Sequence, residues 1–516
     1  MSSSQPSNSR DIEIDSPDIG VRGWARWFWR QLTSMRTALM LLLLLAIAAV
    51  PGSIYPQRSA DPNGVNQYFE NNPDFAAVLD SLQLFDVYTS VWFSAIYILL
   101  FTSLVGCVVP RTKVHYNALR SQPPAAPRNF ARMPAHKIVK SKKADIVERA
   151  EKVLRKQGYR VSTTRTAVSA ERGYLRETGN LVFHFSLIGV LIAVGIGGGL
   201  SYSGQRVLIE GETFVNNLAS YDSISPGTFF DENQLTPLSV RLDKFSVIFD
   251  IRNETNLGTP LDFKATVTSK IGADGEPTQG FIRVNEPLEL PNAKLYLTGN
   301  GYAPVVTVRD VSGQISFSGP VAFLPQDKNY TSLGVYKLPD AKPKQFGMIA
   351  FFYPTAADLV TGAKSSIFPD PINPLLTMNV YEGDLGLDQG IPRNVYSLDI
   401  EKMTQVAGGE AETKAIELER GQTATLPNGL GTVTFDGLKR FISLDISYNP
   451  GVGWILLFSL LSLGGLMITL LVPRRRVWVR KTEDGFELAA LTRGDDPTLE
   501  KVLNDLTDDI KKAKIE

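Results

Sequence analysis

Four runs of apolar residues divide the chain, and each is about as long as the hydrocarbon core of a bilayer requires. They cover residues 37–54, 91–109, 180–200 and 452–472. About 35 mostly polar and basic residues precede the first run, and no clean small-residue cleavage site follows it. We therefore expect it to be retained rather than removed as a signal peptide. The pattern predicts a polytopic α-helical membrane protein with four transmembrane helices.

Basic residues gather beside particular ends of these runs, although 53 Lys and Arg balance 53 Asp and Glu in the 516-residue chain. Four arginines lie between residues 22 and 36, residues 110–179 hold 17 basic against five acidic side chains, and three arginines occupy 474–476. The positive-inside rule predicts that these regions and both termini are cytoplasmic, and that residues 55–90 and 201–451 lie outside. Binding to nucleic acid or lipid headgroups is the alternative, but the alternation with apolar runs favours topology, and we expect no nucleic-acid partner.

Residues 1–36 combine a polar start with an aromatic, basic stretch. The first 20 or so residues are rich in Ser, Asn and Asp, and we expect them to be disordered. Trp24, Trp27 and Phe28 then recur at helical spacing among arginines, which predicts a helix at the membrane surface; stacking on a cofactor is the alternative. In the outer loop, an Asn-Pro pair at residues 72–73 predicts the start of a short helix.

The basic segment, residues 110–179, has a folded pattern of its own. It contains "HKIVKS", typical of a strand, then "ADIVERAEKVLRKQG", a charged amphipathic helix ending at Gly158, and a further strand. We expect a small cytoplasmic α/β segment. The tail, residues 473–516, is expected to contain two short strands and a capped helix from about Pro497.

Residues 201–451 consist of short runs rich in β-branched and aromatic residues, separated by Gly, Pro, Asn and Asp. This pattern predicts a large extracytoplasmic all-β domain, either a sandwich or an open barrel. It contains no histidine or cysteine, which excludes metal ligation by the usual soft side chains. Glu210 and Glu212 are neighbouring acids, but we expect them to be solvated, and we predict no catalytic residues.

His184 is the ionisable residue that stands out, because it lies within the third apolar run of a chain with three histidines. On a helix, Gly189, Ala193 and Gly197 form a small-residue seam opposite His184, suited to close packing against another helix. A charged group at this depth costs about 2.5–3.5 kcal/mol, so a neutral, paired or metal-ligating imidazole is favoured. A hydrogen-bonded or snorkelling interfacial histidine is the alternative, and the residues alone leave both open.

The remaining candidates for chemistry are weaker. Cys107 is the single cysteine, so no internal disulfide is possible, and we expect a small buried residue. His115 follows the second apolar run and is within reach of a cytoplasmic-side cofactor, but a solvated loop histidine is the favoured interpretation. His136, beside Pro134 in the basic segment, has no special context.

Several stretches resemble one family in its order. They are "LTSMRTALMLLLLLAIAAVPGSIYPQ", "FDVYTSVWFSAIYILLFTSLVGCVVPR", "GNLVFHFSLIGVL", "VLIEGETF" and "ISYNPGVGWILLFSLLSLGGLMI" followed by "RRRVWVR". Together they cover nearly the whole chain and are similar to the ResB (also called CcsB) family of System II cytochrome c biogenesis proteins. The resemblance implies a multi-pass protein of the bacterial cell membrane.

The same resemblance implies partners and a site. A polytopic CcsA- or ResC-like protein joins the chain to form the cytochrome c synthase, which moves heme across the membrane and attaches it to apocytochrome c. His184 matches the family's transmembrane histidine, an axial ligand of heme iron together with a histidine of the partner. Thioredoxin-like proteins keep the substrate's cysteines reduced, so the link to thiol chemistry is indirect. Whether Cys107 matches a cysteine implicated in some relatives is left open.

The function expected from the resemblance is heme delivery, with heme b as a transient substrate and this chain as a non-catalytic or co-catalytic subunit. A non-heme membrane-anchored scaffold, whose outer β-domain binds a secreted protein, is the alternative from another class. An intrinsic b-type electron carrier is disfavoured, because it normally needs two intramembrane histidines and this chain offers His184 alone.

Overall fold

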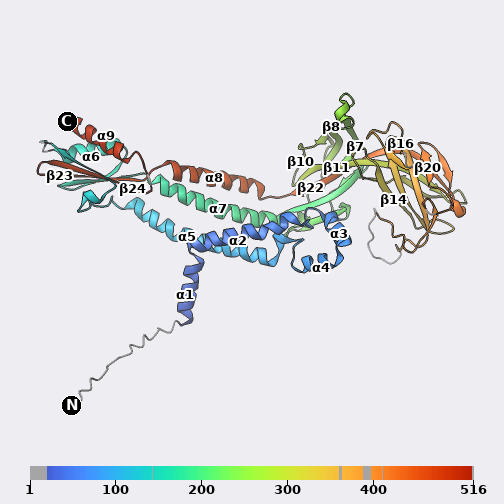
Figure 1. Ribbon diagram of the computed structural model, residues 1–516, viewed down its shortest axis with the longest axis horizontal. Helices are drawn as coiled ribbons and strands as arrows, with labels where there is room; N and C mark the ends of the chain where they lie inside the picture. The colour runs from blue at the N-terminus through green and yellow to red at the C-terminus, as the bar shows by residue number, and fades with distance from the viewer. Residues whose placement is uncertain are drawn as a thin grey trace, which may run out of the picture. The chain divides into compact units, whose positions relative to one another are not determined.

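The computed structural model describes residues 20–141, 143, 145–359, 363–387, 397–409, 411–494 and 496–513. The chain divides into two compact units (Figure 1). Unit 1 is Met1–Gly197 with Gly451–Glu516, and unit 2 is Gly198–Pro450. Apart from Gly20, the N-terminal stretch expected to be disordered lies outside the described residues.

Among the residues that the structure describes, four helices are long and apolar enough to cross a membrane, which is the expected number. They are α2 (Met35–Ile54), α5 (Val91–Arg120), α7 (Leu175–Leu200) and α8 (Val452–Leu471) (Figure 1). The Ser34 hydroxyl accepts a hydrogen bond from the Thr37 amide at 3.2 Å and so caps α2. Helix α5 continues past its apolar run and through Pro110, so its last three turns are polar and basic.

Short helices flank α2. The expected aromatic helix is α1 (Val21–Leu32), and its Trp24, Trp27 and Phe28 side chains are exposed. The segment between α2 and α5 folds into α3 (Pro62–Asn71), α4 (Pro73–Ser81) and η1 (Val87–Thr89). The expected helix from Pro73 is present as α4, but α3 was missed, although Asp61 and Pro62 are typical of a helix start: the Asp61 carboxylate accepts the Gly64 amide at 2.8 Å.

Helices α7 and α8 approach closely through small residues. Gly179, Gly189, Ala193 and Gly197 are buried on α7, which confirms the small-residue seam. A Cβ atom at Gly465 of α8 would lie 2.6 Å from the Phe183 amide nitrogen, and one at Gly189 would lie 2.5 Å from the Phe458 ring. Only glycine lets the two backbones come this near.

The two basic segments form one α/β domain rather than separate pieces. Its antiparallel sheet has the order β1-β24-β23-β3-β2. The elements are β1 (Ala135–Lys140), α6 (Ile146–Lys156), β2 (Arg160–Thr163), β3 (Ala167–Arg172), β23 (Arg475–Thr482), β24 (Gly485–Thr492), α9 (Leu499–Lys512) and η2 (Phe130–Arg132).

Both faces of this sheet are covered. Side chains alternate along β23, so Val477 and Val479 pack with α6 and α9 on one face while Trp478 packs with Phe130 on the other. The Trp478 indole also donates a hydrogen bond to the Pro124 carbonyl oxygen at 2.9 Å, which fixes the proline-rich segment below the sheet. Strands β23 and β24 and helix α9 of the tail thus share one hydrophobic core with β1, α6 and β3, which lie more than 300 residues earlier in the chain.

Glu171 stabilises the pairing of β3 with β23, and this residue is only 3 % exposed. Its carboxylate accepts hydrogen bonds from Arg474 Nε and Arg476 Nε, both at 2.9 Å, and from the Tyr174 hydroxyl at 2.9 Å. Burial alone would raise the pKa of Glu171, but the hydrogen bonds from Arg476 and Tyr174 and the charges of the two arginines outweigh it and lower the pKa.

Unit 2 is built of antiparallel sheets, as expected for a large β-rich domain. The first contains β4 (Tyr202–Ile209), β6 (Ser223–Pro226), β10 (Leu288–Leu290), β11 (Ala293–Arg309), β12 (Ile315–Pro320), β21 (Thr423–Thr425) and β22 (Thr432–Tyr448). The second contains β5 (Thr213–Val215), β7 (Leu238–Phe249), β8 (Pro260–Ile271) and β9 (Thr278–Arg283). The third contains β13 (Leu324–Pro325), β14 (Ser332–Leu338), β15 (Phe346–Tyr353), β18 (Leu375–Glu382), β19 (Thr404–Ala407) and β20 (Ile416–Glu419). A small pair is formed by β16 (Ala356–Asp358) and β17 (Lys364–Ser366), and short turns are η3 (Leu218–Ser220), η4 (Glu232–Gln234), η5 (Glu254–Asn256) and η6 (Pro427–Gly429).

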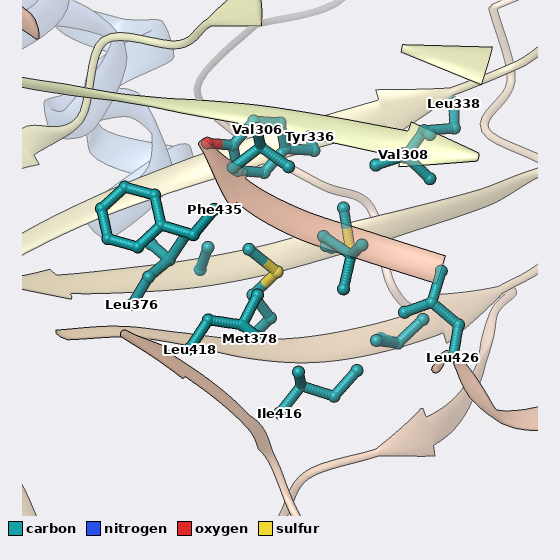
Figure 2. Close-up of a cluster of buried hydrophobic side chains, with 14 of the residues drawn as sticks. Val306, Val308, Tyr336, Leu338, Leu376, Met378, Ile416, Leu418, Leu426 and Phe435 are labelled. Atoms are coloured by element: carbon teal, nitrogen blue, oxygen red, sulfur yellow. The ribbon is translucent and has the colours of Figure 1, made fainter. Parts of the chain in front are cut away.

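The long strands β11 and β22 serve two sandwiches in succession. The C-terminal half of β11 and the N-terminal half of β22 pack against the third sheet. Figure 2 shows Val306 and Phe435 facing Leu376 and Met378 in this core. The other halves of the two strands pack against the second sheet in a separate core that includes Leu295. The expected sandwich is therefore present twice, on one shared first sheet.

The chain enters and leaves unit 2 on neighbouring strands. Helix α7 leads into β4, β22 leads into α8, and β4 pairs with β22 so that Tyr202 lies opposite Tyr448.

Replacing Gly465 by Ala should destabilise unit 1, because the new Cβ atom would meet the α7 backbone. Overpacking of this kind costs about 1–3 kcal/mol. The matched control is Gly464→Ala, since nothing lies within 4 Å of a Cβ atom there. We expect the thermal midpoint of the detergent-solubilised chain to fall for Gly465→Ala and to stay within a degree or two for Gly464→Ala. Equal midpoints would show that the helices do not approach at Gly465.

Replacing Glu171 by Gln should loosen the β3–β23 pair at neutral pH, by about 2 kcal/mol, because hydrogen bonds to a charged acceptor are lost. The lowered pKa means that this stabilisation is complete above the ordinary carboxyl range near pH 4.5 and is lost as pH falls through the folded-state pKa. Amide exchange of β3 and β23, corrected for intrinsic rates, should therefore be faster in the variant at pH 7 and converge with the unsubstituted chain toward pH 3. A pH-independent difference would contradict the role of the charge.

Candidate functional site

His184 lies within the apolar part of α7, nine residues after the helix begins at Leu175. At about 1.5 Å per residue, this places it roughly 14 Å along the helix axis. The residue is half-buried in unit 1. The ring of Phe183 packs edge-on against the imidazole, with ring centroids 5.0 Å apart.

One hydrogen bond defines the state of the imidazole. Its Nδ1 lies 2.7 Å from the carbonyl oxygen of Asn180, one turn earlier on the same helix. A carbonyl oxygen can only accept, so Nδ1 carries the proton, and in the neutral ring Nε2 carries the lone pair. Within the described chain, no hydrogen bond to Nε2 is formed. This is the arrangement that metal-binding histidines commonly have, with the second nitrogen oriented by a carbonyl.

The open nitrogen lies on a face of α7 that α8 does not cover. Gly179 and Gly189, which contact α8, are five residues before and after His184, about 140° around the helix on either side. Farther along the His184 side, the Tyr97 hydroxyl of α5 donates to the Leu191 carbonyl oxygen. The neighbouring Phe185 is 46 % exposed. The site therefore has one donor, the His184 imidazole, and lies beside one exposed apolar side chain, that of Phe185.

The structure does not bring the other two histidines to His184. The prediction that His115 is a solvated loop residue is wrong. Helix α5 continues through it, and the residue is only 9 % exposed. Its Nε2 lies 3.0 Å from the Thr178 hydroxyl of α7, and its buried Nδ1 has no hydrogen-bond partner in the described chain. His136 lies in β1 opposite Ala489, in the α/β domain.

Cys107 is buried on α5, as expected for a small packed residue. Its thiol donates to the Thr33 carbonyl oxygen at 2.8 Å, between α1 and α2. A Cβ atom at the adjacent Gly106 would lie 2.1 Å from Thr33, so this part of α5 packs tightly against the bend between the two helices.

Glu210 and Glu212 of unit 2 are not simply solvated, which corrects the sequence-based expectation. The Glu210 carboxylate accepts the Phe245 amide at 2.8 Å and the Arg440 amide at 3.2 Å, joining β4 to β7 and β22. The Glu212 carboxylate accepts the Ile209 amide at 3.1 Å. Between them, Gly211 has a positive φ of +92°. The Glu-Gly-Glu sequence at residues 210–212 is the feature of the sequence that could have indicated this corner between sheets.

Comparison with known proteins identifies the family. A family model described as ResB-like matches residues 35–504. This chain belongs to the ResB-like family. The match includes all four membrane-crossing helices, the site at His184 and most of the α/β domain, and it confirms the resemblance found in the sequence.

Curated relatives of this ResB-like chain are named cytochrome c biogenesis protein CcsB. The protein of Prochlorococcus marinus (strain NATL1A) is 28 % identical over 276 residues, covering 51 % of this chain and 59 % of the relative. That of Thermosynechococcus vestitus is 26 % identical over 279 residues, covering 53 % and 60 %. That of Microcystis aeruginosa is 24 % identical over 293 residues, covering 55 % and 62 %. The alignments thus span about three fifths of each relative's length.

Replacing Glu210 by Gln should destabilise unit 2, because an amide has one acceptor oxygen for two backbone amides. Leaving one amide unpaired costs about 1–3 kcal/mol. Glu212→Gln is the matched control, since it removes the same charge while its single oxygen still serves the Ile209 amide. We expect faster amide exchange around Phe245 and Arg440 in Glu210→Gln alone. Similar exchange in both variants would contradict the corner role.

Proposed function

We propose that this chain is a membrane subunit of the System II cytochrome c synthase, which binds heme in transit through His184 and helps to present it for covalent attachment to apocytochrome c. The observation that favours this function is the hydrogen bond from His184 Nδ1 to the Asn180 carbonyl oxygen, which leaves Nε2 open. The family and the names of its CcsB relatives support the same assignment.

The chemistry of the site suits heme iron held inside a membrane. A protonated imidazole at bilayer depth costs several kcal/mol, whereas the neutral ring is tolerated and is the form that binds iron. Orientation by a helix carbonyl reduces the rotation that ligation would otherwise have to restrict. The heme, as cargo, contributes the iron and a flat apolar ring that fits the exposed apolar side chains beside His184.

The second axial ligand belongs to a partner in this proposal. His115 is bonded to Thr178, and His136 is part of the α/β domain, so neither supplies a donor on the His184 face. A CcsA- or ResC-like protein would provide that histidine and would cover the face of α7 that α8 leaves open. Because each chain holds the iron by one nitrogen, binding is firm only in the complex.

The orientation we propose follows the charges. The α/β domain carries the basic segments and lies on the cytoplasmic side with both termini, while unit 2 lies outside. There unit 2 docks apocytochrome c or braces the partner. Thioredoxin-like proteins keep the apocytochrome's thiols reduced, and Cys107, bonded to Thr33 within the helices, takes no part. Helix α1 rests on the membrane surface through Trp24, Trp27 and Phe28.

Replacing His184 by Ala should lower the heme content of the complex purified with its CcsA-like partner by at least about tenfold. Loss of groups that merely orient a metal ligand already costs 10- to 100-fold, so loss of the ligand itself should cost no less. Absorbance in the Soret region gives the heme content, and the yield of covalent cytochrome c gives the activity. Added imidazole should restore part of both, because it replaces the lost nitrogen.

The control for this test is His136→Ala, which removes a histidine outside the membrane helices and should leave heme content unchanged. Normal heme content and cytochrome maturation in His184→Ala would refute the ligand role. A complex that holds no heme in either form, yet still binds a secreted protein through unit 2, would instead favour the scaffold function.

A further inference from the structure

A cavity of about 550 Å³ lies within unit 1, where the ends of α5, α7 and α8 meet the α/β domain. Residues of β2, β3 and the turns beside them line one side, and the helix ends line the other. Its lining includes Arg160, Glu171, Arg172, Leu175, Thr178 and Leu471. The volume is in the range of small-molecule sites in proteins.

The cavity has an apolar wall and a basic wall. Leu175 and Leu471 contribute to the apolar wall at the helix ends, and they are 62 % and 70 % exposed, so this wall opens toward the surface that lipid would cover. Arg160 and Arg172 contribute to the basic wall from β2 and β3. Such a division suits an amphipathic anion.

The two arginines have no acidic partner within the described chain. Arg160 donates to the Leu119 carbonyl oxygen, and Arg172 donates to the Gln157 carbonyl oxygen at 3.4 Å. The one acid of the lining, Glu171, is already neutralised by Arg474 and Arg476. The cavity therefore keeps a net positive charge available to a ligand.

The depth of the cavity corresponds to the headgroup region of a bilayer. It begins where the apolar run of α8 ends, at Leu471, and it lies beside the polar first turn of α7. The hydrogen bond between His115 and Thr178 marks the same level on α5, beyond that helix's apolar run.

We propose that this cavity binds the phosphate headgroup of an anionic phospholipid, with Arg160 and Arg172 contacting the phosphate and an acyl chain lying along Leu175 and Leu471. Basic pockets between membrane helices on the cytoplasmic side commonly bind such headgroups, and guanidinium groups match phosphate geometry. The proposal uses the membrane orientation proposed above and does not depend on heme binding. A bound lipid would tie the α/β domain to the helix ends.

Heme is disfavoured as the occupant because of the direction of His184. Leu175 and Thr178 line the cavity about 180° and 120° around α7 from His184. Thr178 also lies about 9 Å from it along the helix axis. A ligand in the cavity thus faces another side of the helix than the open Nε2.

The test measures lipid retention by the full chain, purified in detergent and mixed with defined lipids, by native mass spectrometry. The probes are phosphatidylglycerol and phosphatidylcholine with identical acyl chains. We expect one phosphatidylglycerol to be retained preferentially, and Arg160→Ala/Arg172→Ala to weaken that retention roughly 10- to 30-fold, as the loss of two basic contacts with an anionic lipid implies. The matched control is Arg155→Ala/Arg165→Ala, which removes the same charge from exposed positions outside the cavity and should change little.

The variant Arg160→Lys/Arg172→Lys keeps the charge and should retain an intermediate affinity, which covers the case in which the alanine variant fails to fold. Equal retention of both lipids, or an equal loss in the control variant, would overturn the proposal. The proposal would also be overturned if Arg160→Ala/Arg172→Ala retained phosphatidylglycerol normally but its complex with the partner lost heme. That result would make the cavity part of the heme path.

Discussion

The antiparallel pair β3–β23 is the constraint on which unit 1 depends. Helix α7 begins directly after β3, and β23 begins directly after α8, so pairing these strands brings the start of one helix beside the end of the other. Gly173 makes the junction possible: its φ is +90°, and a Cβ atom there would lie 2.2 Å from the Pro473 carbonyl oxygen. The buried Glu171 then holds both strands through Arg474 and Arg476.

The direction of His184 follows from this junction. Once the helix ends are fixed side by side, Gly179 and Gly189 turn toward α8, and the periodicity of the helix turns His184 away from it. A bulky residue at either glycine would force a different rotation of α7. The open nitrogen is thus a consequence of small residues on the opposite face of the same helix.

Much of this could be predicted from local patterns. The four apolar runs, the small-residue seam and the distinction of His184 are readable within one helix or one window of sequence. Strand β22 is harder to read from the sequence, because its buried positions change phase between Phe435 and Ile442 and its pairing with β11 is irregular near Gly437. The burial of His115 was missed because the apolar run ends at residue 109, whereas helix α5 continues to Arg120.

Contacts distant in sequence were beyond such reasoning. Nothing in the tail itself indicates that β23 joins β3, and the Glu210 corner requires knowing that Phe245 and Arg440 are neighbours. These contacts arise from strand pairing, for which a single sequence offers no register.

Under the proposed function, weak binding of heme iron by one chain alone is useful, because the heme must later be released. A transported ligand must be bound firmly enough to leave the lipid and loosely enough to be passed on. One oriented imidazole from each of two proteins meets this requirement, because separating the helices by a small distance removes one of the two bonds to iron without unfolding either chain. In this proposal the closely packed α7–α8 pair is the surface beside which a partner helix would bind.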